Sequence, residues 1–271
     1  MEKKMVPGET TGGKVARMVA GAEGIEIKAT VPRAQIQAAM ARYGLVIDPG
    51  ESRYIYFFDT PDLDLMKAGI IARARRVVGG EHDSTIKFRP VEPVRISTQW
   101  RKYPGFKIEA DASEKGVVTS GSFSMPVKKG RIKRIAAGEL PIAELFTEEQ
   151  RAFLREMAKH EIDFSRVTIL GPLSAHRWTF EDPACPWPLT VELWEREDGE
   201  MLMELSIKTP VQQAAAAIGG FMAFLAEVGA ERDVDQQAKT RWAMSHYATK
   251  IRPPLADPPV PDVVTPPRAG S

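Results

Sequence analysis

The sequence predicts an α+β protein: a closed, eight-stranded antiparallel β-barrel with helices packed outside it. Three observations predict this fold. Charged residues recur two or four positions apart in short apolar segments, as Glu26 and Lys28 do on either side of Ile27. Eight segments have the length and alternation typical of strands. Segments with helical spacing of apolar residues lie between and after them, where they can cover a barrel.

The elements follow from these patterns in chain order. Strands are expected over 24–31, 52–59, 70–78, 84–90, 104–112, 167–181, 188–197 and 200–209. Helices are expected over 32–43, 126–137, 147–159, 210–228 and 235–248. The helix over 147–159 opens with Thr147 and Gln150 at the spacing of a capping box. The alanine-rich helix over 210–228 is small and apolar enough to lie flat on a sheet.

The charged residues of the strands share one face. Side chains two or four positions apart in a strand point the same way. The pairs are Glu26 and Lys28, Arg73 and Arg75, Lys87 and Arg89, Lys107 and Glu109, and Glu204 and Lys208. An antiparallel sheet with one face in water would show the same alternation. The dominance of Arg, Lys and Glu favours the other interpretation, an inward face that lines a tunnel. Such a tunnel would bind a highly charged anion together with a cation.

Composition and length are those of a globular protein. The chain has 271 residues, 43% of them apolar and 27% charged, and a formal net charge of +1, which does not favour nucleic acid as a partner. We expect a flexible leader over 1–22, one tunnel domain over 23–250 and a disordered proline-rich tail over 251–271. The single cysteine, Cys185, excludes an intramolecular disulfide. Because neither a signal peptide nor a membrane span is evident, we expect a cytoplasmic protein.

A longer motif carries a resemblance to a known family. Residues 56–75 read YFFDTPDLDLMKAGIIARAR. This run resembles the corresponding segment of the CYTH superfamily, the triphosphate tunnel metalloenzymes. Members of that superfamily include inorganic triphosphatases, thiamine triphosphatases, class IV adenylyl cyclases and fungal RNA triphosphatases. The resemblance extends more weakly from Gly24 to Lys250 and implies a triphosphate tunnel.

The resemblance implies roles for individual residues. The ExExK signature of the family falls on 24–28, where Gly24 replaces the first glutamate, and the closing ExE falls on Glu204 and Ser206. Implied phosphate-binding residues are Lys28, Arg73, Arg75, Lys87, Arg89, Arg177 and Lys208. Implied ligands for Mg²⁺ or Mn²⁺ are Glu26 and Glu204, with Glu192 and Glu109 ranking second. Lys239, in the last helix, is the implied catalytic residue. Arginine forks and compact lysines suit phosphate oxygens, and carboxylates beside a phosphate require a divalent cation between them.

The expected function is therefore the metal-dependent hydrolysis of a triphosphate, either inorganic or organic, such as thiamine triphosphate or a nucleotide. One alternative is a module that binds polyphosphate or a nucleotide with little or no turnover, since Gly24 and Ser206 stand where the family has glutamates and fewer carboxylates remain. Another is a class IV type of adenylyl cyclase. Glu109 and Asp111 could also form a solvated edge, and Glu192 could pair with an arginine. The sequence does not reveal the oligomeric state.

Three other patterns carry less weight. Residues 8–14 fit GxxxxGK, but Val15 stands where a P-loop has Ser or Thr. The basic cluster formed by Lys128, Lys129, Arg131, Lys133 and Arg134 is typical of a solvated helix. Asp59, Asp62 and Asp64 are expected to stabilise a turn.

Overall fold

The computed structural model of the chain describes residues 21–49, 52–113, 116–228 and 239–251. The expected leader over 1–22 and the expected proline-rich tail over 251–271 lie almost entirely outside these ranges. Among the described residues, no helix has both the length and the apolar character needed to cross a membrane.

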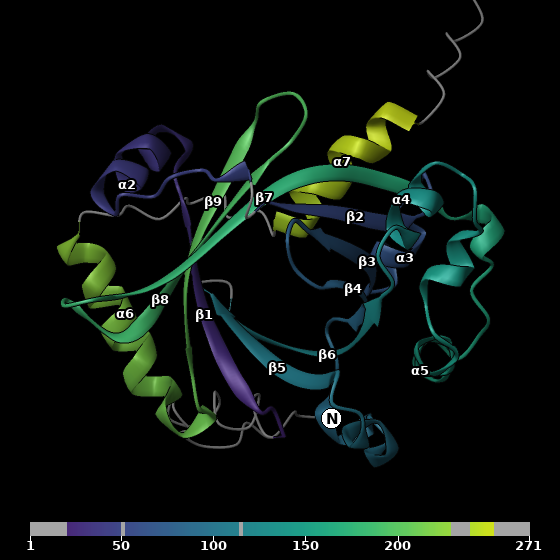
Figure 1. The fold of residues 1–271 in the computed structure, drawn as a ribbon. Coiled ribbons are helices and arrows are strands. Elements are labelled where there is room, and N and C mark those ends of the chain that lie inside the picture. The colour runs from purple at the N-terminus through teal and green to yellow at the C-terminus, as the bar shows by residue number, and fades with distance from the viewer. Residues whose placement is uncertain (1–20, 50–51, 114–115, 229–238, 252–271) are drawn as a thin grey trace, which may run out of the picture.

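Nine strands close into one barrel in the order β1, β5, β6, β4, β3, β2, β7, β8, β9 (Figure 1). Their bounds are β1 Gly24–Val31, β2 Arg53–Asp59, β3 Ile70–Val77, β4 His82–Phe88, β5 Phe106–Ser113, β6 Gly116–Val127, β7 Thr168–Asp182, β8 Cys185–Glu195 and β9 Met201–Thr209. Neighbouring strands are antiparallel, except that β1 and β5 run parallel. The predicted closed barrel is confirmed, but the prediction of eight purely antiparallel strands is wrong.

The ninth strand is β6, which the sequence hides. Its Ser and Gly residues resemble a loop, yet Phe123 pairs with Ile86 on one side and Phe106 on the other. A larger residue would not fit at Gly121, because a Cβ there would lie 2.9 Å from the side chain of Ile96. The helix expected over 126–137 is correspondingly shorter, since β6 continues to Val127.

Helices and short helical turns lie outside the strands. The α-helices are α2 Ile36–Arg42, α3 Asp64–Lys67, α4 Arg131–Ala136, α5 Glu148–Ala158, α6 Ala214–Glu227 and α7 Lys239–Ile251. The 3₁₀ turns are η1 Arg33–Gln35, η3 Pro93–Arg95, η4 Thr98–Lys102, η5 Ile142–Leu145, η6 Phe164–Arg166 and η7 Val211–Gln213.

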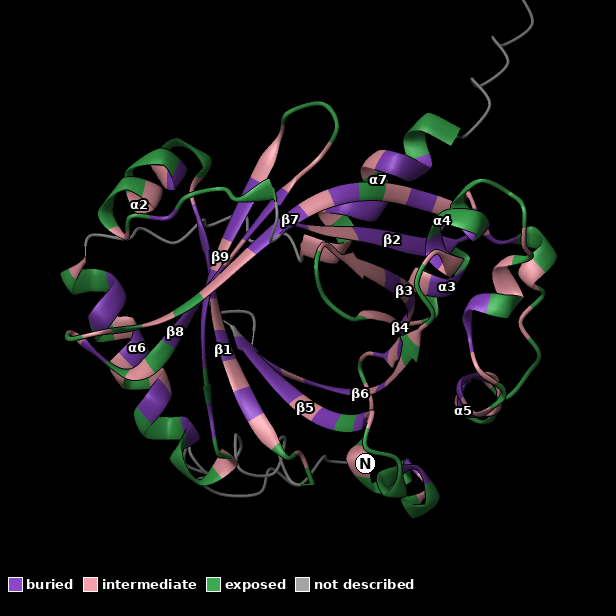
Figure 2. Cartoon of the chain, viewed as in Figure 1, coloured by how far each residue is buried: buried purple, intermediate pink, exposed green. Residues whose placement is uncertain are grey.

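Two apolar cores lie between the barrel and its helices. α6 and α5 lie on opposite sides of the barrel (Figure 1). On the α6 side, Phe221 and Phe224 belong to one buried cluster with Ile25 and Ile27 of β1. On the α5 side, Phe153 belongs to a second cluster with strand residues of β3, β4, β5 and β6. Buried and partly buried residues alternate along β1 (Figure 2). The apolar faces of these strands therefore point outward, toward the helices, and leave the charged faces inside.

Gln150 ties α5 to the barrel. The predicted capping box is confirmed: the Gln150 amide N–H donates to Thr147 Oγ1 at 3.3 Å, and Gln150 Oε1 accepts from the Thr147 amide at 3.1 Å. The Gln150 Nε2 group also donates to the carbonyl oxygens of Ser84, at 3.0 Å, and Phe123, at 2.9 Å. Since Gln150 is fully buried, these bonds satisfy polar groups that have no access to water.

The aspartate-rich run after β2 forms a turn, as expected for Asp59. The fully buried Asp59 carboxylate accepts hydrogen bonds from the backbone amides of Thr60, Leu65 and Met66 at 2.7–2.9 Å. These bonds fix the start of the short helix α3. They also set the direction in which β3 enters the barrel with its inward-facing Arg73 and Arg75.

The two ends of the barrel differ. α7 packs at the end where β2 and β8 finish and β3 and β7 begin. There Ala243 and Met244 are buried in one cluster with Phe57 and Trp194. The Tyr247 hydroxyl donates to the Pro172 carbonyl oxygen at 2.7 Å. The opposite end gathers the first residues of β1, β2, β4, β5 and β8, because neighbouring strands are antiparallel apart from β1 and β5.

Candidate functional site

The inward faces of the strands carry the site residues expected from the sequence. Strand registers place them together: Glu26 lies opposite Lys208, and Glu192 lies opposite both Arg177 and Glu204. The closed barrel excludes a sheet with its charged face in bulk water. Lys107, which belongs to the same charge pattern, is exposed and makes no ion pair among the described residues.

Asp111 of β5 is the centre of one buried charge cluster. Its carboxylate lies 2.9 Å from Lys28 Nζ, 3.4 Å from Arg89 Nη1 and 3.6 Å from Lys87 Nζ. Burial alone would raise the pKa of this carboxyl, but the surrounding cations hold it well below its usual range. From the sequence, Asp111 was expected only as part of a solvated edge. That interpretation is wrong for Asp111, which is 4% exposed.

Lys28 of β1 joins three carboxylates. Its Nζ lies 2.9 Å from Asp111, 3.0 Å from Glu26 and 3.9 Å from Glu204. Burial would lower the pKa of Lys28, but the three carboxylates raise it well above its ordinary value. Lys28 is therefore a permanent positive charge within the acidic part of the interior.

Lys239 of α7 joins two further carboxylates. Its Nζ lies 2.7 Å from Glu204 Oε1 and also donates to Glu192 Oε2, while the ring centroid of Trp194 lies 5.1 Å away. Burial would lower the pKa of Lys239, but Glu204 and Glu192 raise it. Burial would likewise raise the pKa of Glu192, but the Lys239 ammonium keeps it well below its usual range. Lys239 is thus charged at neutral pH.

Arginines form the cationic side of the interior. Arg75 pairs with Asp83 at 2.7 Å, and Arg177 lies 4.0 Å from Glu192. Arg73 has no ion pair among the described residues, and its Nε is buried without an acceptor there. Burial and the neighbouring Arg75 lower the pKa of Arg73. A buried N–H group without an acceptor is costly, so this position favours an incoming anion.

Arg53, the first residue of β2, belongs to the same group and was missed from the sequence. Burial lowers its pKa, and the charges of Arg75 and Arg177 lower it further. The signal was available, because Arg53 lies two positions before Ile55 and therefore shares its face. Ile55 pairs with Arg75 and so also faces inward.

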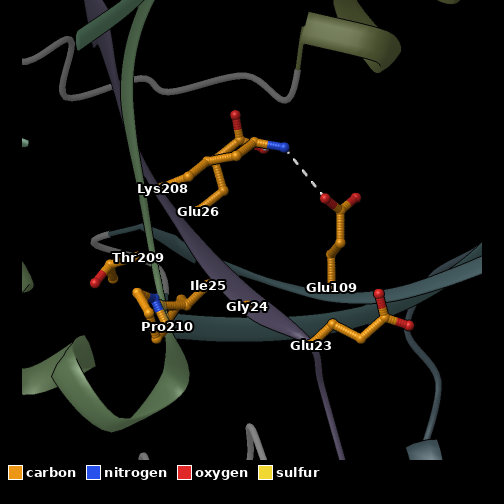
Figure 3. A pocket seen from close by; sticks show the side chains of 8 residues that line it. All are labelled: Glu23, Gly24, Ile25, Glu26, Glu109, Lys208, Thr209 and Pro210. Carbon is orange, nitrogen blue, oxygen red and sulfur yellow. Dashed lines mark hydrogen bonds and ion pairs between the residues drawn. The ribbon is translucent and has the colours of Figure 1, made fainter. Parts of the chain in front are cut away.

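A pocket of about 270 Å³ opens at the end of the barrel opposite α7, around Gly24 (Figure 3). Figure 3 shows Lys208 reaching toward Glu109, and the two groups are 3.1 Å apart. Gly24 contributes no side chain here, and the Ser206 hydroxyl donates to Glu26 at 3.1 Å. The two positions where the resemblance expects acids therefore supply empty space and a hydroxyl group.

The carboxylates are only partly arranged for a divalent cation. Among the described residues, no three Asp, Glu, His or Cys side chains form a preformed metal site. Glu192 and Glu204, however, both contact the single ammonium of Lys239. Mg²⁺ commonly binds through one or two carboxylates and completes its shell with phosphates and water. The donor set fits that limited coordination. Glu109 pairs instead with Lys208, so the structure does not gather it with Glu192 and Glu204.

Comparison with known proteins gives a structural answer only. No protein-family model and no curated protein sequence matches the chain. A protein from Bacillus halodurans, described as a candidate adenylate cyclase, matches with a TM-score of 0.55 and 14% identity over 82% of this chain and 97% of that chain. HpAC1 from Hippeastrum, described as a candidate adenylyl cyclase with a dominant triphosphatase activity, matches with a TM-score of 0.57 and 17% identity. That match covers 82% of this chain and 95% of that chain.

The fold class is thus a closed, mixed β-barrel with a charged interior and helices outside. The two solved proteins share this fold, which is the one expected from the resemblance of residues 56–75 to the CYTH superfamily. At such low identity the comparison establishes the fold and leaves the activity to be argued from the site.

Proposed function

We propose that the barrel binds a triphosphate, inorganic or organic, and hydrolyses it with the help of Mg²⁺ or Mn²⁺. The observation that carries this proposal is Arg73, a half-buried arginine whose Nε is itself buried and lacks an acceptor among the described residues. Arg75 lies two positions farther along the same face of β3. A group of guanidiniums in a closed interior is stable only beside anions, and phosphate oxygens match their paired donors.

The cations divide into two sets in this proposal. Arg73, Arg75 and Arg177 would hold one part of the phosphate chain through bidentate contacts. Lys87 and Arg89 would hold another part, exchanging some of their attraction to Asp111 for the ligand. Burial lowers the pKa of Lys87, Asp111 partly offsets this, and an added phosphate would favour its charged form further. Lys28 and Lys208 lie next to the carboxylates and are the remaining proposed phosphate-binding cations.

Glu204, Glu192 and Glu26 would hold the divalent cation, with Glu109 in a secondary place at the open end. The cation would supply charge neutralisation on the transferring phosphoryl group. The arginines orient the terminal phosphate, and the closed wall limits access of water. Lys239 is the candidate catalytic residue. Because its pKa is raised, it is an ammonium that stabilises negative charge and not a base that accepts a proton.

A second candidate function is supported by the lysines themselves. Lys28, Lys208 and Lys239 neutralise the carboxylates, and Gly24 and Ser206 remove two potential ligands. This arrangement favours a module that binds polyphosphate or a nucleotide with little or no turnover. A cyclase that acts on a nucleotide triphosphate is a third possibility, since two structural neighbours are described as cyclase candidates.

The wider setting of this function also remains a proposal. We propose that 23–250 acts as one domain and that the protein works in the cytoplasm without a membrane or nucleic-acid partner. The buried, unpaired Cys185 is consistent with a reducing compartment.

Phosphate release from tripolyphosphate, thiamine triphosphate and ATP tests the proposal, with each substrate assayed in EDTA, Mg²⁺ and Mn²⁺. We expect metal-dependent turnover that Glu204→Gln reduces by at least about a hundredfold, because a metal ligand is lost. Glu139→Gln, which removes an exposed partner of Arg134, is the matched control and should leave the rate unchanged. Tight binding without turnover would favour the binding module. The absence of both binding and turnover would reject the proposed function.

A further inference from the structure

We propose that the Lys239 ammonium occupies the divalent-cation position between Glu192 and Glu204, so that the metal and Lys239 bind these carboxylates in alternation. This inference rests on the proposed function only in assigning a divalent cation to the acidic side of the barrel. Its consequence is that metal binding and the docking of the first turn of α7 compete.

The geometry at Glu192 and Glu204 supports the shared position. The two residues lie directly opposite each other on β8 and β9, and both carboxylates contact Lys239 Nζ. An ammonium between two carboxylates lies where their oxygens converge, which is also where a cation of higher charge would bind best. The side chain of Lys239 is 15% exposed, so little room remains for a second cation beside it.

The other lysines do not block this position in the same way. Lys28 Nζ lies closer to the carboxylates of Glu26 and Asp111 than to that of Glu204, which is 3.9 Å away. Lys208 lies farther toward the open end, between Glu26 and Glu109. Lys28 and Lys208 are also on barrel strands, whose pairing fixes their backbones. Lys239 is carried by α7, a helix packed at the end of the barrel, and can leave without breaking a strand.

Only the start of α7 has to move. Ala243, Met244 and Ala248 are buried in the cluster with Phe57 and Trp194, and Tyr247 bonds to the Pro172 carbonyl. These contacts hold the middle and end of the helix. Lys239 contributes its two carboxylate contacts and its place near the Trp194 ring. Trp242 also packs against this cluster, and the Arg196 guanidinium lies 4.4 Å from its ring centroid. Exchange of Lys239 for a metal ion would therefore loosen the Lys239 end of the first turn and leave the rest of α7 in place.

Competition implies reciprocity. If Lys239 weakens metal binding by some factor, the metal weakens the docking of Lys239 by the same factor. Removal of the ammonium should then tighten metal binding. It also leaves Glu192 and Glu204 as two neighbouring carboxylates without that cation, which increases their attraction for Mn²⁺.

The test measures Mn²⁺ binding to the full chain without any triphosphate, by the electron paramagnetic resonance signal of free Mn²⁺. We compare the wild type with Lys239→Met and with Lys250→Met, a control on the same helix whose partner is Glu197 outside the barrel. We expect Lys239→Met to bind at least about tenfold more tightly than the wild type, because one charge-assisted competitor is removed. Lys250→Met should match the wild type.

Amide hydrogen exchange of the unmodified protein is the second measurement, in case Lys239→Met folds poorly. Saturating Mn²⁺ should speed exchange of the amides that donate to the first-turn carbonyls of α7 by at least about threefold and leave the segment around Tyr247 unchanged. Equal Mn²⁺ affinity of a folded Lys239→Met and the wild type would overturn the inference. So would unchanged exchange at saturating Mn²⁺, or no Mn²⁺ binding to either protein.

Binding of tripolyphosphate in EDTA, measured in parallel, separates this inference from the proposed function. Tripolyphosphate binding together with equal Mn²⁺ affinities would reject the competition and leave the phosphate site standing. If tripolyphosphate does not bind, the proposed function fails, while the Mn²⁺ comparison still decides between competition and independence at Lys239.

Discussion

Replacement of Asp111 by Asn gives the sharpest prediction, because stability and ligand affinity should change in opposite directions. The substitution keeps the shape of the side chain and removes its charge. Lys28, Lys87 and Arg89, which all lie within 3.6 Å of that carboxylate, lose a shared partner. The folded protein then holds uncompensated positive charge, whereas an anionic ligand meets less competition for the same cations.

The contact distances set the size of the effect. One ion pair at 2.9 Å has a gross Coulomb energy of about 6 kcal/mol at an effective dielectric constant of about 20. Breaking a buried pair by removing one partner typically costs about 3–5 kcal/mol. Because Lys28 keeps Glu26 at 3.0 Å, we take the lower end and expect the free energy of unfolding to fall by about 3 kcal/mol.

Urea unfolding followed by far-UV circular dichroism measures the first effect. With a slope near 3 kcal/mol per molar urea, the midpoint should fall by about 1 M. Calorimetric titration with tripolyphosphate measures the second effect, and the affinity of Asp111→Asn should rise about fivefold or more. Glu92→Gln removes only an exposed partner of Arg95 and should shift the unfolding free energy by less than about 1 kcal/mol. A stability within 0.5 kcal/mol of wild type for Asp111→Asn, as an order-of-magnitude limit, would refute the reasoning.

Three further predictions concern the binding site, pH and the packing of α5. Arg73→Met should weaken tripolyphosphate binding by about tenfold or more without loss of stability. Arg101→Met, at an exposed position, should leave the affinity for tripolyphosphate unchanged. Equal losses of affinity for the two variants in calorimetric titrations would contradict this prediction. The pKa of the Asp111 carboxyl is depressed in the folded state, so its contribution to stability is full above about pH 4 and is lost as the pH falls below that value. Urea midpoints measured from pH 7 to 3 should therefore fall at the acid end. The fall should be smaller for Asp111→Asn. Gln150→Ala should lower the free energy of unfolding by about 2–4 kcal/mol, because it removes two buried hydrogen bonds, to the carbonyls of Ser84 and Phe123. Thr147→Ala should lower it by about 1 kcal/mol, and the reverse order in urea unfolding would be inconsistent with these contacts.

Much of the barrel was predictable because burial and charge alternate with the strand period. β1 has the predicted bounds, and most other predicted strands differ from the structure by one to three residues at their ends. The same alternation placed Glu26, Lys28 and Arg73 on one face. The capping box at Thr147 was predictable because it depends on residues only three positions apart.

The parts that the sequence hid depend on contacts between distant segments. β6 contains few residues with high strand propensity and is held by two neighbouring strands, so its local sequence gave a weak signal. Asp111 could not be separated from a solvated edge, because its burial depends on cations from β1 and β4. The parallel pairing of β1 and β5 joins segments about eighty residues apart and has no local signature.

The roles of the carboxylates were harder still to predict. The residue types favoured metal ligands, and the structure shows Glu192 and Glu204 bound to Lys239. A lysine on a helix and two glutamates on strands carry no spacing rule that would reveal such a contact. Most members of the charged interior were therefore predictable, with Arg53 and Asp111 as exceptions, while only the structure gives their pairing.

The charges inside the barrel are proposed to converge on one phosphate chain. A crystal structure of the full chain with tripolyphosphate would show whether they do. We expect density for the anion inside the barrel, within hydrogen-bonding distance of Arg73 and Arg75 and near Lys87. Density for the anion only on the outer surface, for example beside the lysines that precede α4, would contradict it.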